Sequence, residues 1–272
     1  MAEDTAPLVV LAAGQRCGST LVQRLLCSHP RVRIWGEHAG QLRALLAART
    51  RLRRWTEAGG AAGRCEWDTA AHHGFIANLT PEADVIDQAC AAFVETLFAE
   101  PARECGRPVW GFKEVRYGLS DVVMLRDLFP RMRVIVIVRD PRDVLRSLDE
   151  WERGTGWSRA RTEESLRYWL HVAGGFAAAD SDPYLRDVIL PVRYEDLVAF
   201  SDRWADRIAG HCRLEPELMD VSVFDERVHT AGPRGRSARE LRAWSQLPAS
   251  LRGLLDDDEV RMVASMYGYD LT

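Results

Sequence analysis

Short apolar runs alternate with longer segments of helical spacing along most of the chain. The first apolar run, residues 7–14 (PLVVLAAG), ends at a glycine, as a buried strand entering a tight loop does. Residues 131–140 (RMRVIVIVRD) include five consecutive β-branched residues, Val134 to Val138, so both faces of this segment are apolar. Such a run is typical of a strand inside a parallel sheet. Further strands are predicted at 107–113 and within 187–197.

Helices are predicted between and after these strands. Apolar residues recur at helical spacing in six segments, which are 19–30, 40–55, 81–100, 120–130, 141–151 and 163–180. Two more helices are expected near the C-terminus, around SDRWADRIAGH and DEVRMVASMYG. The stretches 56–67 and 152–162 contain several glycines, and we expect both to be mobile loops.

This alternation of strands and helices predicts an α/β fold, in which a central, mostly parallel sheet is flanked by helices. The chain shows no internal repeat and no convincing linker, so we expect one domain over residues 1–272. A chain of this length can bury a sizeable core.

Composition and charge exclude several classes of function. The formal net charge is −4, whereas a protein that binds nucleic acid usually carries a basic balance. No apolar segment reaches the roughly 18 residues of a membrane span, and the acidic N-terminus is unlike a signal peptide. We therefore expect a cytoplasmic protein without nucleic-acid or membrane partners. The six cysteines form no C-x-x-C pair and the seven histidines no H-E-x-x-H pattern, so no disulfide or metal site is predicted.

A glycine-rich loop, residues 12–23 (AAGQRCGSTLVQ), joins the first predicted strand to the first predicted helix. Glycines let backbone N–H groups turn inward, and a helix start adds unpaired N–H groups with a partial positive charge. Arg16, Ser19 and Thr20 add a guanidinium and two hydroxyls. The loop therefore predicts a binding site for an oxyanion, although a glycine turn before a capped helix would contain the same residues.

The loop differs from the ATP-binding Walker motif, G-x-x-x-x-G-K-[ST], in which a lysine reaches the terminal phosphates and a hydroxyl binds Mg²⁺. Here only three residues separate Gly14 from Gly18, and no lysine follows. The six residues between Cys17 and Arg24 also exclude the C-x5-R pattern of cysteine phosphatases. An ATP-dependent kinase is thus disfavoured, but it is the alternative enzyme class.

A second candidate anion site follows the strand predicted at 131–140. Arg139 stands at the carboxyl end of this strand, where α/β sheets bind their ligands. Ser147 lies on the helix that follows and could reach the same side. Arg139 could instead form an ion pair with Asp140 or Asp143.

Taken together, GQRCGSTLVQRLLCSHPRVRIWGE and VIVIVRDPRDVLRSL resemble the sulfotransferases that use 3′-phosphoadenosine 5′-phosphosulfate (PAPS). The resemblance is to the branch with R-S-G-T-T loops, which includes tyrosylprotein sulfotransferases and bacterial carbohydrate and small-molecule enzymes. It covers 8–37, 109–151 and 191–198, and more weakly 228–247. It implies a three-layer P-loop-like fold, PAPS as the cofactor, no metal ion, and in-line transfer of a sulfuryl group to a hydroxyl or amine.

The resemblance also implies the residues that hold the 5′-phosphosulfate. These are the loop residues Arg16, Cys17, Gly18, Ser19 and Thr20, with Cys17 in place of the usual small serine. Arg16 is in addition expected to act in catalysis.

At the other end of the nucleotide, the resemblance implies a second set of contacts. Arg139 and Ser147, eight residues apart as in the family, correspond to the pair that binds the 3′-phosphate. Tyr194, in VRYEDL, corresponds to a tyrosine near the nucleotide. Arg234 or Arg236 stands for a late basic residue that touches the cofactor.

Two further residues are expected to carry the chemistry. Lys113, the only lysine of the chain, corresponds to a lysine that stabilises the transition state. A compact ammonium can follow the departing bridging oxygen, whereas a guanidinium suits two fixed oxygens. Glu37 corresponds to the general base of the tyrosylprotein branch, and its neighbour His38 is the second choice because an imidazole titrates near neutrality. Alternatively, Glu37 only pairs with an arginine, and Lys113 is an ordinary lysine.

The acceptor is not indicated by the sequence. Residues 40–107 would shape its pocket, yet they have no clear counterpart in the family. A small molecule, a carbohydrate and a peptide all stay open as acceptors, and so does the oligomeric state. Besides a kinase, the remaining alternative is a nucleotide-binding protein of the same fold that lacks catalytic activity.

Overall fold

The computed structural model describes residues 6–155, 159–179, 181–225 and 249–271. Five strands form one parallel sheet in the order β2-β3-β1-β4-β5. Their bounds are β1 (Leu8–Ala12), β2 (Val32–Trp35), β3 (Val109–Glu114), β4 (Arg133–Val138) and β5 (Ile189–Arg193). The parallel sheet confirms the α/β fold that the alternating pattern predicted.

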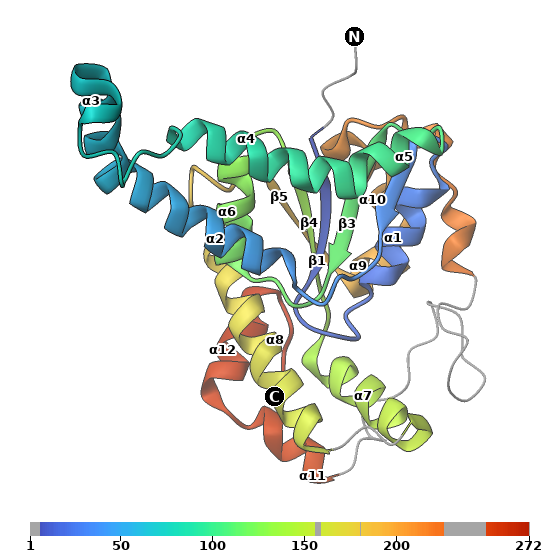
Figure 1. Ribbon diagram of the computed structural model, residues 1–272. Helices are drawn as coiled ribbons and strands as arrows, with labels where there is room; N and C mark the ends of the chain where they lie inside the picture. The colour runs from blue at the N-terminus through green and yellow to red at the C-terminus, as the bar shows by residue number, and fades with distance from the viewer. Residues whose placement is uncertain (1–5, 156–158, 180, 226–248, 272) are drawn as a thin grey trace.

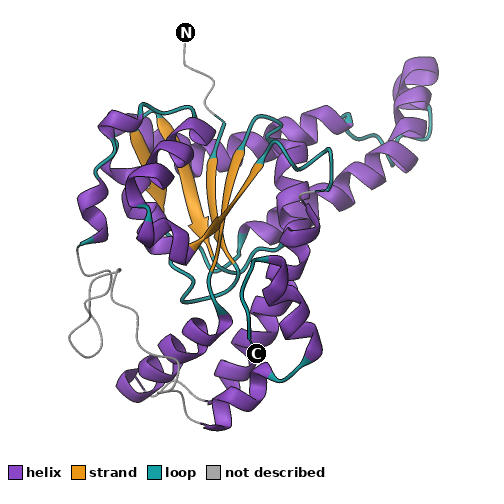
Figure 2. Ribbon diagram, turned by 180° about the vertical axis from the view of Figure 1, so that it is seen from behind, coloured by secondary structure: helices purple, strands orange, loops and turns teal. Residues whose placement is uncertain are grey.

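Helices connect the strands and pack on both faces of the sheet (Figure 1, Figure 2). The α-helices are α1 (Ser19–Ser28), α2 (Leu42–Trp55), α3 (Ala61–Ala70), α4 (Ala83–Val94), α5 (Glu100–Glu104), α6 (Leu119–Leu128), α7 (Pro141–Thr155), α8 (Arg159–Ala179), α9 (Tyr194–Ala199), α10 (Ser201–Cys212), α11 (Ala249–Arg252) and α12 (Asp258–Met266). The shorter turns are η1 (Thr56–Gly60), η2 (Ala71–His73), η3 (Glu95–Ala99), η4 (Pro216–Leu218), η5 (Val221–Phe224) and η7 (Gly253–Leu255). Among these described helices, none is both long and apolar enough to cross a membrane.

The core is centred on β1 and β4. Every residue of β1 is buried, and so are Val134 to Val138 of β4, as their continuous apolar runs predicted. β1 lies between β3 and β4, with Leu11 paired to Glu114 on one side and to Val136 on the other. The carboxyl ends of these three strands therefore reach the same edge of the sheet. Figure 1 shows α7, α8, α11 and α12 beyond that edge.

The segment 56–67, which we expected to be a mobile loop, is helical and forms η1 and most of α3. Its glycines serve close packing: a Cβ on Gly60 would lie 2.1 Å from Thr80 Oγ1, and one on Gly63 would lie 2.6 Å from the backbone nitrogen of Leu79. The prediction of a loop is wrong because these glycines permit close contact and the alanines beside them favour a helix.

The second loop prediction, for 152–162, is also wrong over most of its length. Helix α7 continues to Thr155, and α8 begins at Arg159. Residues 156–158 lie outside the described part of the chain. Arginine, glutamate and alanine are good helix formers, and a glycine inside a helix costs only about 1 kcal/mol, so the two helices extend into this stretch.

Candidate active site

Most of the predicted site residues gather at the carboxyl ends of three neighbouring strands. The glycine-rich loop follows β1, Arg139 follows β4, and Lys113 stands one residue before the end of β3. Because β1 lies between β3 and β4, the three sets of residues meet at one edge of the sheet. This is the edge at which α/β sheets bind their ligands.

The loop after β1 turns through three residues with left-handed backbone conformations. These are Gly14 (φ +84°), Arg16 (φ +66°) and Gly18 (φ +101°), and α1 begins directly after Gly18. A Cβ added to Gly18 would also lie 2.5 Å from the ring of Tyr194. Gly18 is therefore required both by its backbone conformation and by the close approach of Tyr194.

We predict that Gly18→Ala weakens nucleotide binding roughly tenfold or more, since left-handed strain and the clash with Tyr194 both distort the loop. Titration calorimetry with 3′-phosphoadenosine 5′-phosphate (PAP) measures the affinity. Gly210→Ala in α10 is the matched control, because a Cβ at Gly210 meets open space. Unchanged PAP affinity in Gly18→Ala would show that the loop does not hold the nucleotide.

The side chain of Cys17 points into the core. Its side chain is buried, and Sγ lies 3.0 Å from the carbonyl oxygen of Ala13, to which it donates. Burial raises the pKa of the Cys17 thiol to about 12, so the thiol stays protonated at neutral pH. The side chain of Cys17 thus packs in the core and holds the loop against it. Only the backbone N–H of Cys17 could contact a ligand.

Arg16, Arg139 and Ser147 form one contact group, although they come from three separate segments. Arg16 Nε donates a hydrogen bond to Ser147 Oγ at 3.0 Å, which joins the loop after β1 to α7. Arg139 Nη1 donates to the Arg16 carbonyl oxygen at 3.1 Å. The Arg139 guanidinium carbon lies 4.2 Å from the ring centroid of Tyr194. The two segments that the sequence predicts to bind anions are therefore in direct contact.

Arg139 also forms an ion pair with Asp143, which was one of the two alternatives that the sequence suggested for this arginine. Its Nη2 lies 3.5 Å from Asp143 Oδ2. Its Nε is buried and has no hydrogen-bond partner among the described residues. A buried guanidinium N–H without a partner is costly, so Arg139 retains one donor for a further acceptor. The ion pair with Asp143 therefore does not use all of its donors.

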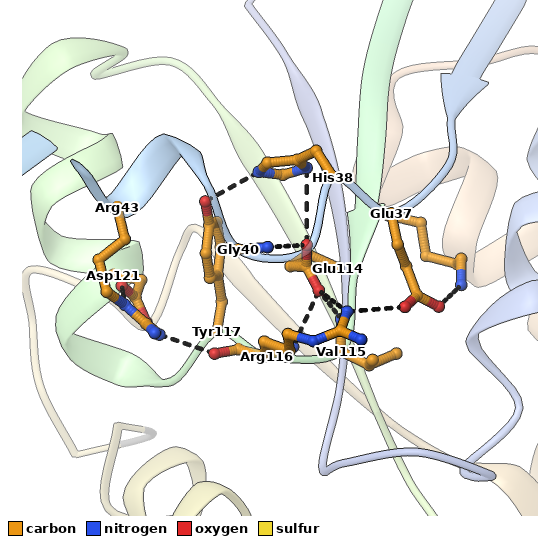
Figure 3. A network of polar contacts seen from close by, with 10 residues as sticks. Glu37, His38, Gly40, Arg43, Glu114, Val115, Arg116, Tyr117 and Asp121 are labelled. Carbon is orange, nitrogen blue, oxygen red and sulfur yellow. Dashed lines mark hydrogen bonds and ion pairs between the residues drawn. The ribbon is translucent and has the colours of Figure 1, made fainter. Parts of the chain in front are cut away.

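Lys113 and Glu37 form a close ion pair beside this group. Lys113 Nζ donates to Glu37 Oε1 at 2.5 Å, and the Lys113 side chain is only 7% exposed. Arg116 Nη1 donates to the second oxygen, Glu37 Oε2, at 3.0 Å (Figure 3). Burial raises the pKa of Glu37, but the hydrogen bonds and charges of Lys113 and Arg116 outweigh burial and leave it below its ordinary value. Glu37 is therefore a carboxylate at neutral pH.

A buried carboxylate, Glu114, connects the segments that carry this ion pair (Figure 3). Its Oε2 accepts from the backbone N–H of Gly40 at 2.6 Å, which fixes the segment after Glu37. Its Oε1 accepts from the backbone N–H of Val115 at 2.9 Å and from Arg116 Nη1 at 3.1 Å. Glu114 is fully buried, so these donors replace the water that a carboxylate needs. It holds the end of β3 against the segment of Glu37.

We predict that Glu114→Gln lowers the free energy of unfolding by about 1–3 kcal/mol, because an amide nitrogen would face backbone N–H groups that need an acceptor. Urea unfolding measures this loss, and turnover should fall with it as Glu37 and Lys113 lose their alignment. Glu104→Gln, at an exposed position of α5, is the control. Equal stability of the two variants would contradict the connecting role of Glu114.

His38 points elsewhere than Glu37 does. Its Nε2 lies 2.8 Å from the Tyr117 hydroxyl, and its ring packs edge-on against Phe112 and Phe98 (Figure 3 shows the Tyr117 contact). Burial lowers the pKa of His38, so the imidazole is neutral at pH 7. The two neighbouring candidates for the base are therefore held by different partners in different directions.

Some residues stand outside these contacts. Ser19 is buried at the first position of α1, and Thr20 follows it on the partly exposed side. Arg234 and Arg236, predicted to touch the cofactor, lie outside the described residues. Within the described part of the chain, no cluster of three or more His, Cys, Asp or Glu side chains is arranged to hold a metal ion. The contact of Arg116 with Glu37 was not predicted, because it spans 79 residues and leaves no local pattern in the sequence.

Comparison with known proteins identifies the family. The sequence profile of the sulfotransferase family matches residues 7–218. The chain belongs to this family. Protein-tyrosine sulfotransferase 1 from Danio rerio is 26% identical over 203 residues, which is 73% of this chain and 50% of that relative. The chain thus spans about half the length of the curated relative it matches.

Two solved structures show the fold of this sulfotransferase family member. The sulfotransferase domain from the Synechococcus PCC 7002 olefin synthase superposes with a TM-score of 0.57 at 19% identity, covering 100% of this chain and 99% of that one. The sulfotransferase domain from the curacin biosynthetic pathway gives a TM-score of 0.56 at 16% identity, covering 98% and 99%. The predicted three-layer, P-loop-like sulfotransferase fold is confirmed.

Proposed function

We propose that this protein is an enzyme that transfers a sulfuryl group from PAPS to a hydroxyl or amine acceptor. The observation that carries the proposal is the contact group of Arg16, Arg139 and Ser147, which unites two anion-binding segments at one sheet edge. Beside it, the next strand presents an ammonium and a carboxylate in contact, Lys113 and Glu37. A donor with anionic groups at both ends and a reaction that moves a proton need these two features together.

The residues present fit PAPS in two respects. Because Gly18 has no Cβ, the ring of Tyr194, which is expected beside the nucleotide, lies directly against the loop that is expected to bind the 5′-phosphosulfate. Arg139 keeps a buried N–H without an acceptor in the described part of the chain. Arg16 and the backbone N–H groups of residues 17–20 would hold the 5′-phosphosulfate. Arg139 and Ser147 would hold the 3′-phosphate, with Tyr194 beside them and with Arg234 or Arg236 as a further contact.

PAPS supplies an activated sulfuryl group that leaves a bridging oxygen when an acceptor attacks. Glu37 takes the proton of the acceptor hydroxyl or amine at a carboxylate oxygen. Lys113 Nζ places its positive charge where negative charge grows on the departing oxygen, and Arg16 adds a second cation. Lys113 is held in advance by Glu37, so little reorganisation is required of it. Glu114 holds the backbone segments that carry Glu37 and Lys113 in fixed positions relative to each other.

A screen of acceptors with ³⁵S-labelled PAPS tests the proposal directly. The panel should contain phenols, carbohydrates and peptides. Peptides that contain tyrosine come first, because the Danio rerio relative is named a protein-tyrosine sulfotransferase. Product is identified by the mass gain of one sulfuryl group. If PAP binds but none of these classes becomes sulfated, the chain is better explained as a nucleotide-binding protein without catalytic activity.

We predict that sulfuryl transfer does not depend on Mg²⁺. The loop lacks the lysine and the spacing of a Walker motif, and a sulfuryl group carries less charge than a phosphoryl group. The cations Arg16 and Lys113 can therefore replace a metal ion. Rates measured with excess EDTA and rates measured with added Mg²⁺ should agree. Activity with ATP that requires Mg²⁺ would favour the kinase alternative instead.

A further inference from the structure

A cavity of about 540 Å³ lies near the end of the sheet that is opposite to the candidate active site. Its walls come from the second half of α2, from α4, from the end of α6 and from the turn before β5. Pro130 and Tyr184, which line it, precede β4 and β5, so the cavity stands near the amino-terminal ends of the strands. We call it the arginine cavity, after Arg49, Arg53, Arg54 and Arg126 in its walls.

The carboxylates of the arginine cavity already have donors. Asp87 accepts from Arg49 Nε at 2.7 Å through Oδ1 and from Arg53 through Oδ2. Glu57 accepts from Arg53 Nη2 at 3.0 Å, and Asp127 accepts from the Tyr184 hydroxyl at 2.8 Å.

Positive charge is left over after these pairs are formed. Four guanidinium groups face three carboxylates, and within the described chain neither Arg54 nor Arg126 has an ion pair. Arg54 is exposed at the end of α2, where it is free to close on a ligand. The cavity therefore favours an anion over a cation or a neutral molecule.

Arg126 gives a second and independent sign of a missing partner. Its guanidinium carbon lies 4.0 Å from the ring centroid of Tyr184, so the planar group is held over an aromatic face. Its Nη1 is buried and lacks a hydrogen-bond partner among the residues that the structure describes. Natural proteins rarely leave such a donor unsatisfied, because the lost hydrogen bond is costly.

We propose that the arginine cavity is a binding site for an organic phosphate or sulfate ester, separate from the PAPS site. Guanidinium groups bind such oxyanions through paired hydrogen bonds. The volume falls within the range of about 300–1,000 Å³ that small-molecule sites occupy, and it exceeds what a bare phosphate ion needs. Tyr184, 43% exposed, offers an apolar edge to the organic part of the ligand.

Titration calorimetry on the full chain, saturated with PAP, tests this proposal. Phenyl phosphate and phenyl sulfate serve as ester probes, and inorganic phosphate as the bare anion. We expect one saturable site for at least one ester, weaker binding of inorganic phosphate, and a loss of affinity of roughly tenfold or more in Arg54→Gln and in Arg126→Gln. Arg252 is exposed on α11, and Figure 1 shows α11 far from α2, α4 and α6. Arg252→Gln should therefore bind like the original chain.

The proposal is overturned if neither ester binds the PAP-saturated protein, or if both arginine variants bind the esters as the Arg252→Gln control does. Binding of inorganic phosphate as tight as that of the esters would overturn the assignment to an organic ligand. Arg54 is exposed, so its variant keeps the test valid even if Arg126→Gln fails to fold. A chain that binds no PAP would contradict the proposed function, yet the comparison among the arginine variants would still decide this question.

Discussion

Lys113→Ala is expected to bind PAP normally and to transfer the sulfuryl group about 10²–10³-fold more slowly. The reason is the position of its ammonium, which is almost fully buried and 2.5 Å from Glu37 Oε1. A charge in such surroundings is weakly screened, so it stabilises a developing negative charge much more than an exposed lysine does. Single-turnover rates at saturating PAPS, together with PAP affinity, separate the chemical step from binding.

Two further variants sharpen this test. Lys113→Met keeps most of the aliphatic side chain, so a slow Lys113→Met variant cannot be explained by lost packing in β3. Lys113→Arg restores a positive charge as a broad guanidinium, and we expect it to recover only a small part of the rate because the site is built for one oxygen. Full recovery in Lys113→Arg would refute the need for a compact ammonium. Normal turnover in Lys113→Ala would remove Lys113 from the mechanism altogether.

Glu37→Gln is expected to slow sulfation by about 10²–10⁴-fold, while PAP affinity stays close to that of the original chain. An amide cannot take the proton of the acceptor, but it has nearly the shape of the carboxylate. His38→Ala is the comparison variant, because His38 is held by Tyr117 and packs among aromatic rings. If Glu37→Gln is active and His38→Ala is not, the role of the base moves to His38.

The pH dependence of turnover gives an independent check on Glu37. Burial raises the pKa of Glu37, but Lys113 and Arg116 lower it by more than burial raises it. The net pKa therefore lies below the ordinary value. The carboxylate is therefore present above that lowered pKa, and activity should be lost only as the pH falls through it. In Lys113→Met one of the two cations is gone, so the acidic limb of the residual activity should move to higher pH. An acidic limb that stays in place would separate Glu37 from the rate.

Much of the fold could be predicted because it follows from local patterns. The apolar run of β4 and the strand, loop and helix at the start of the chain are visible in short windows of sequence. The loop predictions failed because glycine occurs both in flexible loops and at positions where two segments pack closely. Gly60 and Gly63 allow Thr80 and the backbone near Leu79 to approach closely, and a single sequence does not distinguish this use from flexibility.

By itself, the sequence determined that this is a parallel α/β protein with anion-binding segments after two strands and one exceptional lysine, since those features are composed of neighbouring residues. The tertiary structure alone decided which of these residues meet. The contact of Arg16 with Ser147 joins residues 131 positions apart, and that of Lys113 with Glu37 joins residues 76 positions apart. Such contacts depend on the order of strands in the sheet, which brings separate loops to one edge and which no local pattern of side chains records.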